Sequence, residues 1–228
     1  MWDYYATGDR SNAKIYVANH TSEARKQLTV SVAFYNLDGS RKFYQQVKDL
    51  SIPANTSAVG MTIKRVPGLD PVYLVRCQLR DAMDALLAEN VYWQSADDDD
   101  LGDPKNDEQF KTNLIKWAGM SALNAMPAAQ LKTSSSFRVT NGDVAAKITL
   151  TNESSHIAFF LRAEFTEGID GEEILPITYD DNYITVFPHE TRTIDGHFHV
   201  PAQANWSPAL RLEGYNVGKK VLAMQKTK

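Results

Sequence analysis

Apolar and polar residues alternate along most of the chain, as expected for strands that bury one face. The alternation is clearest at residues 157–165, where the odd-numbered positions are all apolar while Arg162 and Glu164 point the other way. A turn at 168–171 and a second strand at 172–179 follow. This stretch therefore predicts half-buried strands packed on a common core.

Similar strands are expected in both halves, separated by turn-forming segments such as Leu37-Asp-Gly39 and Ile52-Pro-Ala-Asn55. In the first half the strands are expected at residues 14–19, 28–36, 41–51, 56–65, 71–81 and 86–94. In the second half they are expected at residues 157–165, 172–179, 183–187, 192–200, 210–215 and 219–225. Short strands at this spacing predict one β-sandwich in each half.

The second half repeats the first in outline. Val17-Ala-Asn-His-Thr-Ser22 is echoed by Leu150-Thr-Asn-Glu-Ser-Ser155, and an alternating strand follows each of them. Asp38-Gly39 and Asp170-Gly171 then take equivalent places. We therefore expect two copies of one supersecondary plan.

The alternation stops between the halves. Asp97-Asp-Asp-Asp100 opens a charged connection with glycine and proline, and apolar residues are then scattered over 110–131. A connection of this length is seldom structureless, so a short helix is expected at 113–125.

Three segments follow from these patterns. A first β-sandwich is expected at residues 1–96, a linker with a partly helical crossover at 97–131, and a second β-sandwich at 132–228. The fold class is all-β. The chain has 228 residues, of which 43% are apolar, and this is enough to fill two cores.

Charge and hydropathy narrow the classes of partner. The formal charge is −4, so there is no basic surplus to neutralise phosphates, and no nucleic acid is expected as a partner. No stretch is long and apolar enough for a transmembrane helix, and no membrane contact is expected. The first residues lack the basic and apolar regions of a signal peptide. We therefore expect the chain to open inside a longer protein.

Cys77 is the only cysteine, so no internal disulfide can form and the redox compartment stays open. It lies on the apolar face of an alternating stretch at 73–79. At such a place we expect a small buried hydrophobe, with a nucleophile as the alternative.

Five short motifs in the second half resemble one family when taken in order. They are Asn152-Glu-Ser-Ser155, Ala158-Phe-Phe-Leu-Arg-Ala163, Glu173-Ile-Leu-Pro176, Asp181-Asn-Tyr183 and Phe187-Pro-x-Glu190. Together these motifs resemble the C-terminal immunoglobulin-like domain of family 2 glycoside hydrolases, in the branch of exo-β-D-glucosaminidases and mannosylglycoprotein endo-β-mannosidases. Asn90-Val-Tyr-Trp93 resembles the end of the preceding immunoglobulin-like domain. His189 departs from the family pattern, which more usually has glycine there.

The resemblance implies two tandem immunoglobulin-like sandwiches that support a catalytic (β/α)8 barrel of the same parent chain. In the resembled enzymes the catalytic pair are glutamates on that barrel, so no catalytic residue is expected here. A β-mannosidase or an exo-β-glucosaminidase is the expected parent. The alternative is a stand-alone carbohydrate-binding or surface adhesion module.

Asp180 and Asp181 are adjacent, so on an extended strand they point to opposite faces and do not form a glycosidase pair. Asp180 and Asn182 are expected to shape a bend by accepting backbone N–H groups. Trp2, Asp181, Asn182 and Tyr183 are the candidate residues for a carbohydrate or interdomain contact. Other aromatic candidates for stacking on a sugar ring are Trp117, Trp206 and Tyr215, for which core packing is the alternative.

Two spacings suggest metal ligands without completing a site. Residues 97–108 approach the spacing of a calcium loop, but Leu101 and Lys105 occupy ligand positions. Asp195-x-His197-x-His199 places three ligand types on one strand face, as any solvent-facing strand can. Solvated acids and surface histidines are expected, and no metal or cofactor.

Overall fold

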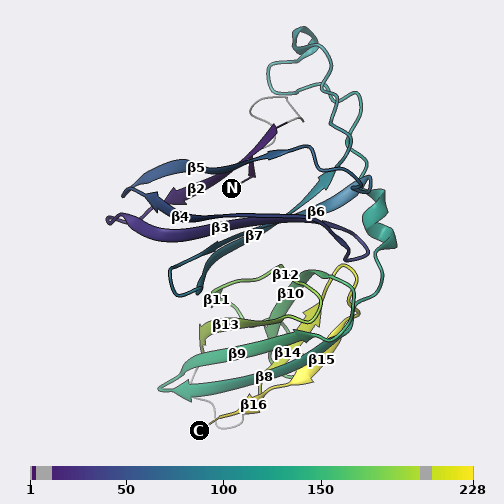
Figure 1. The fold of residues 1–228 in the computed structure, drawn as a ribbon. Coiled ribbons are helices and arrows are strands. Elements are labelled where there is room, and N and C mark those ends of the chain that lie inside the picture. The colour runs from purple at the N-terminus through teal and green to yellow at the C-terminus, as the bar shows by residue number, and fades with distance from the viewer. Residues whose placement is uncertain (1, 4–11, 201–206, 228) are drawn as a thin grey trace. The chain divides into compact units, whose positions relative to one another are not determined.

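The computed structural model describes residues 2–3, 12–200 and 207–227, and for Trp2, Asp3 and Asn12 it describes the backbone alone. The chain divides into two compact units, Met1–Ala125 and Met126–Lys228 (Figure 1). Strands make up almost all of the regular structure. Within the described ranges, no helix is long and apolar enough to cross a membrane. The boundaries expected at residues 96 and 131 stay predictions.

The first unit contains two antiparallel sheets. One has the order β1 (Trp2–Asp3), β2 (Asn12–Asn19), β5 (Thr56–Lys64). The other has the order β4 (Arg41–Ile52), β3 (Arg25–Asn36), β6 (Val72–Arg80), β7 (Leu86–Ser95). Alternate residues of both sheets, among them Ile15, Val32, Ile63 and Val75, form one buried apolar cluster. The strand alternation thus places the core where the sequence predicts it.

Cys77 belongs to that cluster, and its thiol is free and buried. The expectation of a small buried hydrophobe is confirmed. Loss of water around the sulfur raises the pKa of the Cys77 thiol to about 11, from an ordinary value of 9.0. A thiol with so high a pKa holds almost no thiolate at neutral pH and is a poor nucleophile.

We expect Cys77 to weaken folding in alkaline solution. Its thiol ionises near pH 9 in the unfolded chain and near pH 11 in the folded chain, so stability is full below pH 9 and is lost as the pH rises towards 11. Between about pH 8 and about pH 10.5 the free energy of unfolding should fall by about 2 kcal/mol more than in Cys77→Ala. Urea unfolding of both proteins at the two pH values measures the difference. Equal losses would contradict the expectation.

The second unit also contains two sheets. One has the order β11 (Ile177–Tyr179), β13 (Thr191–His199), β9 (Asp143–Asn152), β8 (Leu131–Thr140), β16 (Gln225–Lys226), with β16 parallel to β8. The other has the order β12 (Ile184–Val186), β10 (Ala158–Thr166), β14 (Ala209–Glu213), β15 (Lys220–Ala223). The apolar faces of both sheets form a single core. The architecture is all-β, as expected.

Phe165 of β10 lies at the centre of this core and is fully buried. Its ring stacks on Tyr179 at 5.7 Å between centroids and packs against Phe198 at 5.6 Å. Gly196 makes room for it, because a Cβ at that position would lie 2.5 Å from the Phe165 ring. Burial also raises the pKa of Tyr179 to about 12. The large ring and the glycine opposite it therefore depend on each other.

The repeat seen in the sequence is also a repeat of structure. Asn152 is completely buried, donates to the carbonyls of His156 and Val186, and accepts from the N–H and hydroxyl of Ser154. Asn19 makes the same bonds in the first unit: it donates to the carbonyls of Glu23 and Ile52 and accepts from the N–H and hydroxyl of Thr21. Each asparagine ties the end of one strand to a strand of the other sheet of its unit.

The helix expected at residues 113–125 is not formed, so the partly helical crossover was wrong. The described helical segments are two short 3-10 turns, η1 (Pro104–Asn106) and η2 (Ser121–Ala125). Aspartates upstream capture the backbone N–H groups of this segment. Asp107 Oδ1 accepts from the N–H of Asn113 at 2.9 Å, and Asp99 Oδ1 accepts from that of Ala118 at 2.6 Å. Such side-chain acceptors compete with the bonds that a helix would make.

Candidate functional site

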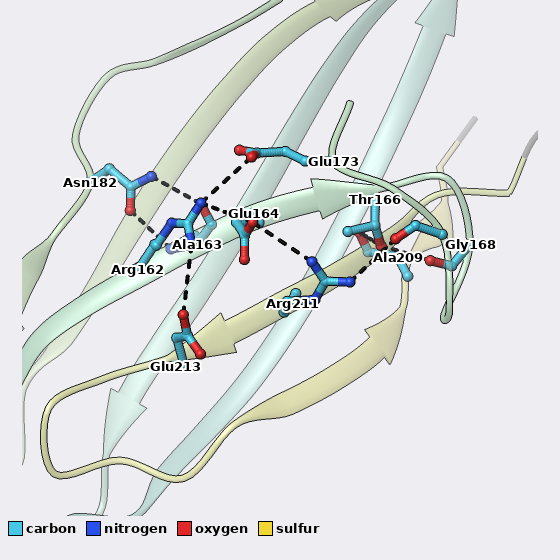
Figure 2. A network of polar contacts seen from close by, with 11 residues as sticks. Arg162, Ala163, Glu164, Thr166, Gly168, Glu173, Asn182, Ala209, Arg211 and Glu213 are labelled. Atoms are coloured by element: carbon cyan, nitrogen blue, oxygen red, sulfur yellow. Dashed lines mark hydrogen bonds and ion pairs between the residues drawn. The ribbon is translucent and has the colours of Figure 1, made fainter. Parts of the chain in front are cut away.

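The bend between β11 and β12 carries three of the four candidate contact residues. Asn182 lies beside β10, where its Oδ1 accepts from the N–H of Ala163 and its Nδ2 donates to the carbonyl of Ala163, both at 2.9 Å (Figure 2). The amide therefore pairs with β10 as a strand residue would. Asp180 Oδ1 accepts from the N–H of Asp195 at 2.7 Å. The expected bend, shaped by the side chains of Asp180 and Asn182, is confirmed.

Asp181 is exposed and turns to other partners. Its Oδ1 accepts from the N–H of Asn182 at 2.9 Å, and its other oxygen lies 3.6 Å from the Arg192 guanidinium. Asp180 and Asp181 thus bond to different groups, as expected for neighbours on an extended chain. This geometry serves to hold a bend in place.

Tyr183 belongs to an exposed aromatic group. Its ring centroid lies 5.2 Å from that of Phe160, and the two side chains are 50% and 37% exposed. Both residues have positive φ, 55° and 54°, a conformation that is uncommon for bulky residues. The rings are tilted by 44°, so they form a ridge and not a flat strip. Tyr215 is also half-exposed and packs edge-on against Phe159.

A charged network lies on the outer face of β10 and β14 (Figure 2). Glu164 forms an ion pair with Arg162 at 2.9 Å and a longer one with Arg211 at 3.7 Å. Arg162 also lies 3.5 Å from Glu173 and 3.7 Å from Glu213. The carboxylates in this network all face a guanidinium, so it is built as a lattice of ion pairs.

Sequence reasoning missed this network. Arg162 and Glu164 were expected on the polar side of their strand, yet the residue Glu164 is only 5% exposed. The antiparallel register places Glu164 opposite Arg211 and Arg162 opposite Glu213, so charges of opposite sign face each other across the strands. The alternation of Arg162 and Glu164 in the sequence gave the side of the sheet, but the register was needed to find the partners.

Trp2 lies in β1, where its backbone pairs with Ile15. Its side chain, and the whole of Trp206, lie outside the described residues. In the described parts of the chain, no three histidine, cysteine or acidic side chains gather as metal ligands would. His199 Nδ1 lies 2.9 Å from Asp143, and Asp195 lies 3.5 Å from the Lys147 ammonium.

Each unit has a hollow in its described surface. The larger, of about 540 Å³, is in the first unit and is lined by Phe34, Ile63, Val66 and Tyr73, with Lys64 at its edge. The other, of about 470 Å³, lies over β8, β9 and β13 of the second unit. The bend residues Asp181, Asn182 and Tyr183 line neither of them.

Family models match both halves of the chain. Residues 11–96 match the mannosidase Ig/CBM-like domain, and residues 109–217 match the exo-beta-D-glucosaminidase Ig-fold domain.

Proteins that match the whole region are known from several organisms. An exo-beta-D-glucosaminidase of Amycolatopsis orientalis is 29% identical over 92% of this chain and 21% of its own length, and one of Arthroderma benhamiae is 27% identical over 96% and 24%. A mannosylglycoprotein endo-beta-mannosidase of Lilium longiflorum is 23% identical over 90% of this chain. The chain spans about a quarter of the length of these relatives.

Solved structures agree with the sequence matches. The crystal structure of an exo-chitosanase of Amycolatopsis orientalis superimposes with a TM-score of 0.87 and 27% identity, over 94% of this chain and 25% of that one. A beta-D-mannosidase from Dictyoglomus thermophilum shares the fold, with a TM-score of 0.55. The two halves of the chain are therefore immunoglobulin-like domains of glycoside hydrolase family 2, of the C-terminal type found in its exo-β-D-glucosaminidase and mannosidase branch.

Proposed function

We propose that this chain is a non-catalytic accessory region of a larger family 2 glycoside hydrolase, where it buttresses the catalytic (β/α)8 barrel of the same parent chain. One observation carries the proposal. Relatives that are named as enzymes align with 92% or more of this chain, yet the chain spans only 21% to 24% of their length. Most of such an enzyme therefore lies outside the matched region.

The acids of the second unit support an accessory role. A glycosidase needs two carboxyl groups about 5–9 Å apart across the scissile bond, one of them free to give a proton. Asp180 accepts a backbone N–H, and Asp181 binds both a backbone N–H and a guanidinium. Glu164 is enclosed by two guanidinium groups. These acids bind groups of the protein itself, which supports an accessory role.

For the parent we propose exo-β-D-glucosaminidase or β-mannosidase activity. The family model of the second unit is named for the first activity, and that of the first unit for the second. Relatives named for both kinds of enzyme match 90% or more of the chain. The sequence identities with the exo-β-D-glucosaminidases, 29% and 27%, exceed the 23% with the mannosidase, which favours the amino-sugar substrate.

The alternative function, a stand-alone carbohydrate-binding or adhesion module, has one observation in its favour. Tyr183 and Phe160 present aromatic rings to solvent, and such rings stack on pyranose faces. Titration with chitosan or mannan oligosaccharides separates the two proposals. Saturable binding that Tyr183→Ala abolishes would favour the module.

We expect the isolated chain to leave p-nitrophenyl β-D-glucosaminide and the matching β-mannoside intact. The reason is that the described acids near the family motifs are committed to backbone groups and arginines. Release of p-nitrophenol measures the outcome, with the parent enzyme as positive control. Hydrolysis at enzyme-like rates would overturn the proposal. Removing this region from the parent is expected to lower the thermal midpoint of the parent, and an unchanged midpoint would speak against a buttress.

A further inference from the structure

A long arm of the first unit carries an unusual amount of exposed apolar surface. We define the arm as residues 97–119, which run from β7 towards η2 and extend beyond the strands of that unit (Figure 1). Phe110 is 94% exposed, Trp117 72% and Ile115 64%, and Leu101 and Leu114 are also exposed. Single exposed apolar residues are common on proteins, but a group of five on one element is typical of an interaction surface.

The arm has a defined shape. Its two sides meet at an antiparallel bridge, where the N–H of Asp100 donates to the carbonyl of Lys116 at 2.6 Å and the N–H of Ile115 donates back to Asp100 at 2.8 Å. Asp99 fixes the far side through the N–H of Ala118. Lys116 also pairs with Asp97 at 3.5 Å. Asp97 and Asp99, which belong to the segment with a calcium-loop-like spacing, therefore hold the two sides of the arm together.

Gly102 allows the two sides of the arm to approach each other. Its φ is +68°, in the left-handed region that favours glycine, and a Cβ at this position would lie 2.6 Å from the Ile115 side chain. Ile115 thus packs over a glycine, while Phe110 and Trp117 are exposed. An apolar surface that is ordered before it binds loses little conformational entropy on docking.

The charge of the arm limits what can cover it. Seven acids and three lysines give the arm a formal charge of −4, the same as that of the whole chain. A second copy of the arm would bring like charges together, and an anionic lipid surface would repel it. A complementary partner has an apolar groove bordered by arginine or lysine.

The comparisons point to where such a partner lies. The exo-beta-D-glucosaminidase Ig-fold model begins at residue 109, so the most exposed side chains of the arm belong to the family domain. The matched relatives continue for about three quarters of their length outside this region. The arm thus belongs to a domain type that is found next to much more protein.

We propose that the arm docks this region onto the remainder of the parent glycoside hydrolase, with Phe110, Ile115 and Trp117 inserted in an apolar groove that has a basic border. The proposal rests on the proposed function. It adds the element that makes the contact and the chemistry of the surface that receives it.

Limited trypsin digestion tests the docking, because Lys111 and Lys116 lie within the arm. We expect cleavage at these two lysines to be at least about tenfold slower in the full parent enzyme than in the isolated chain, since a buried segment is cut only after it opens. Phe110→Ser with Trp117→Ser in the parent should restore cleavage to the rate of the isolated chain. The matched control is Met83→Ser, an exposed apolar residue in a turn outside the arm, which should leave the protection unchanged.

Cleavage that is equally fast in the parent and in the isolated chain would overturn the docking. If removal of the whole region still lowers the thermal midpoint of the parent, the proposed function stands and only the role of the arm fails. If removal changes nothing, the buttress itself fails. A concentration-dependent dimer of the isolated chain, lost in the double variant, would assign the arm to a second copy and also overturn the proposal.

Discussion

Replacing Phe165 by alanine is expected to lower the free energy of unfolding of the second unit by about 3–5 kcal/mol. The ring is fully buried, stacks on Tyr179 and packs against Phe198. Gly196 directly opposite has no side chain that could fill the space, so the cavity would persist. Urea unfolding of the full chain, with hydrogen exchange to assign the loss to residues of the second unit, measures the effect.

Phe160→Ala is the matched control, because the same residue type lies on the same strand with its ring exposed. We expect a cost below about 1 kcal/mol for it, as is usual for surface positions. A similar loss for both variants would show that the core of this unit does not depend on the Phe165 ring. Gly196→Ala should be harmful in the native protein and better tolerated in Phe165→Ala, because the clash involves that ring.

Asn152→Ala is expected to cost about 2–4 kcal/mol, since it leaves buried carbonyl groups without a donor. The amide donates to Val186 at 2.9 Å and to His156 at 2.7 Å, and it accepts two bonds from Ser154. Asn19→Ala should cause a comparable loss in the first unit, where the amide makes the same connections. Thermal and urea unfolding, resolved by hydrogen exchange in each unit, measure both losses.

An asparagine on an exposed strand position gives the control. Asn90 lies in β7 and is exposed, so Asn90→Ala should change the free energy of unfolding by less than about 0.5 kcal/mol. If Asn19→Ala and Asn152→Ala were as mild as this control, the repeated amide pattern would not be a source of stability. In that case the hydroxyl groups of Thr21 and Ser154 would be enough to bond the backbone groups at the two strand ends.

Much of the fold follows from local features that a sequence displays directly. The odd positions of 157–165 are all apolar, and Ile157, Phe159, Leu161, Ala163 and Phe165 are all buried. The similarity of segments 17–22 and 150–155 likewise predicts two copies of one plan, and Asn19 and Asn152 make the same bonds in the two units. The motif order around Asp181-Asn-Tyr183 indicated the family that the comparisons then showed.

The helix prediction at 113–125 failed for a reason that local patterns do not contain. Scattered apolar residues with alanine and methionine suit a helix. In the structure, however, the side chains of Asp99 and Asp107, which precede the segment, accept its backbone N–H groups. Whether they do so depends on how the chain turns at Gly102 and Pro104. Phe110 and Trp117 of the same segment are exposed.

By itself the sequence determined most of the strands, the repeat and the family, because side-chain alternation and turn residues act over a few neighbouring positions. It did not predict β8 and β9, and the strand expected at 172–179 is formed only at Ile177–Tyr179. Only the tertiary structure decided that Glu164 is enclosed by Arg162 and Arg211, that Asn182 pairs with Ala163, and that the apolar residues of the arm are exposed. Those contacts join residues that are distant in the chain. They depend on strand register and loop path, which are set by the packing of the whole unit and not by any local pattern.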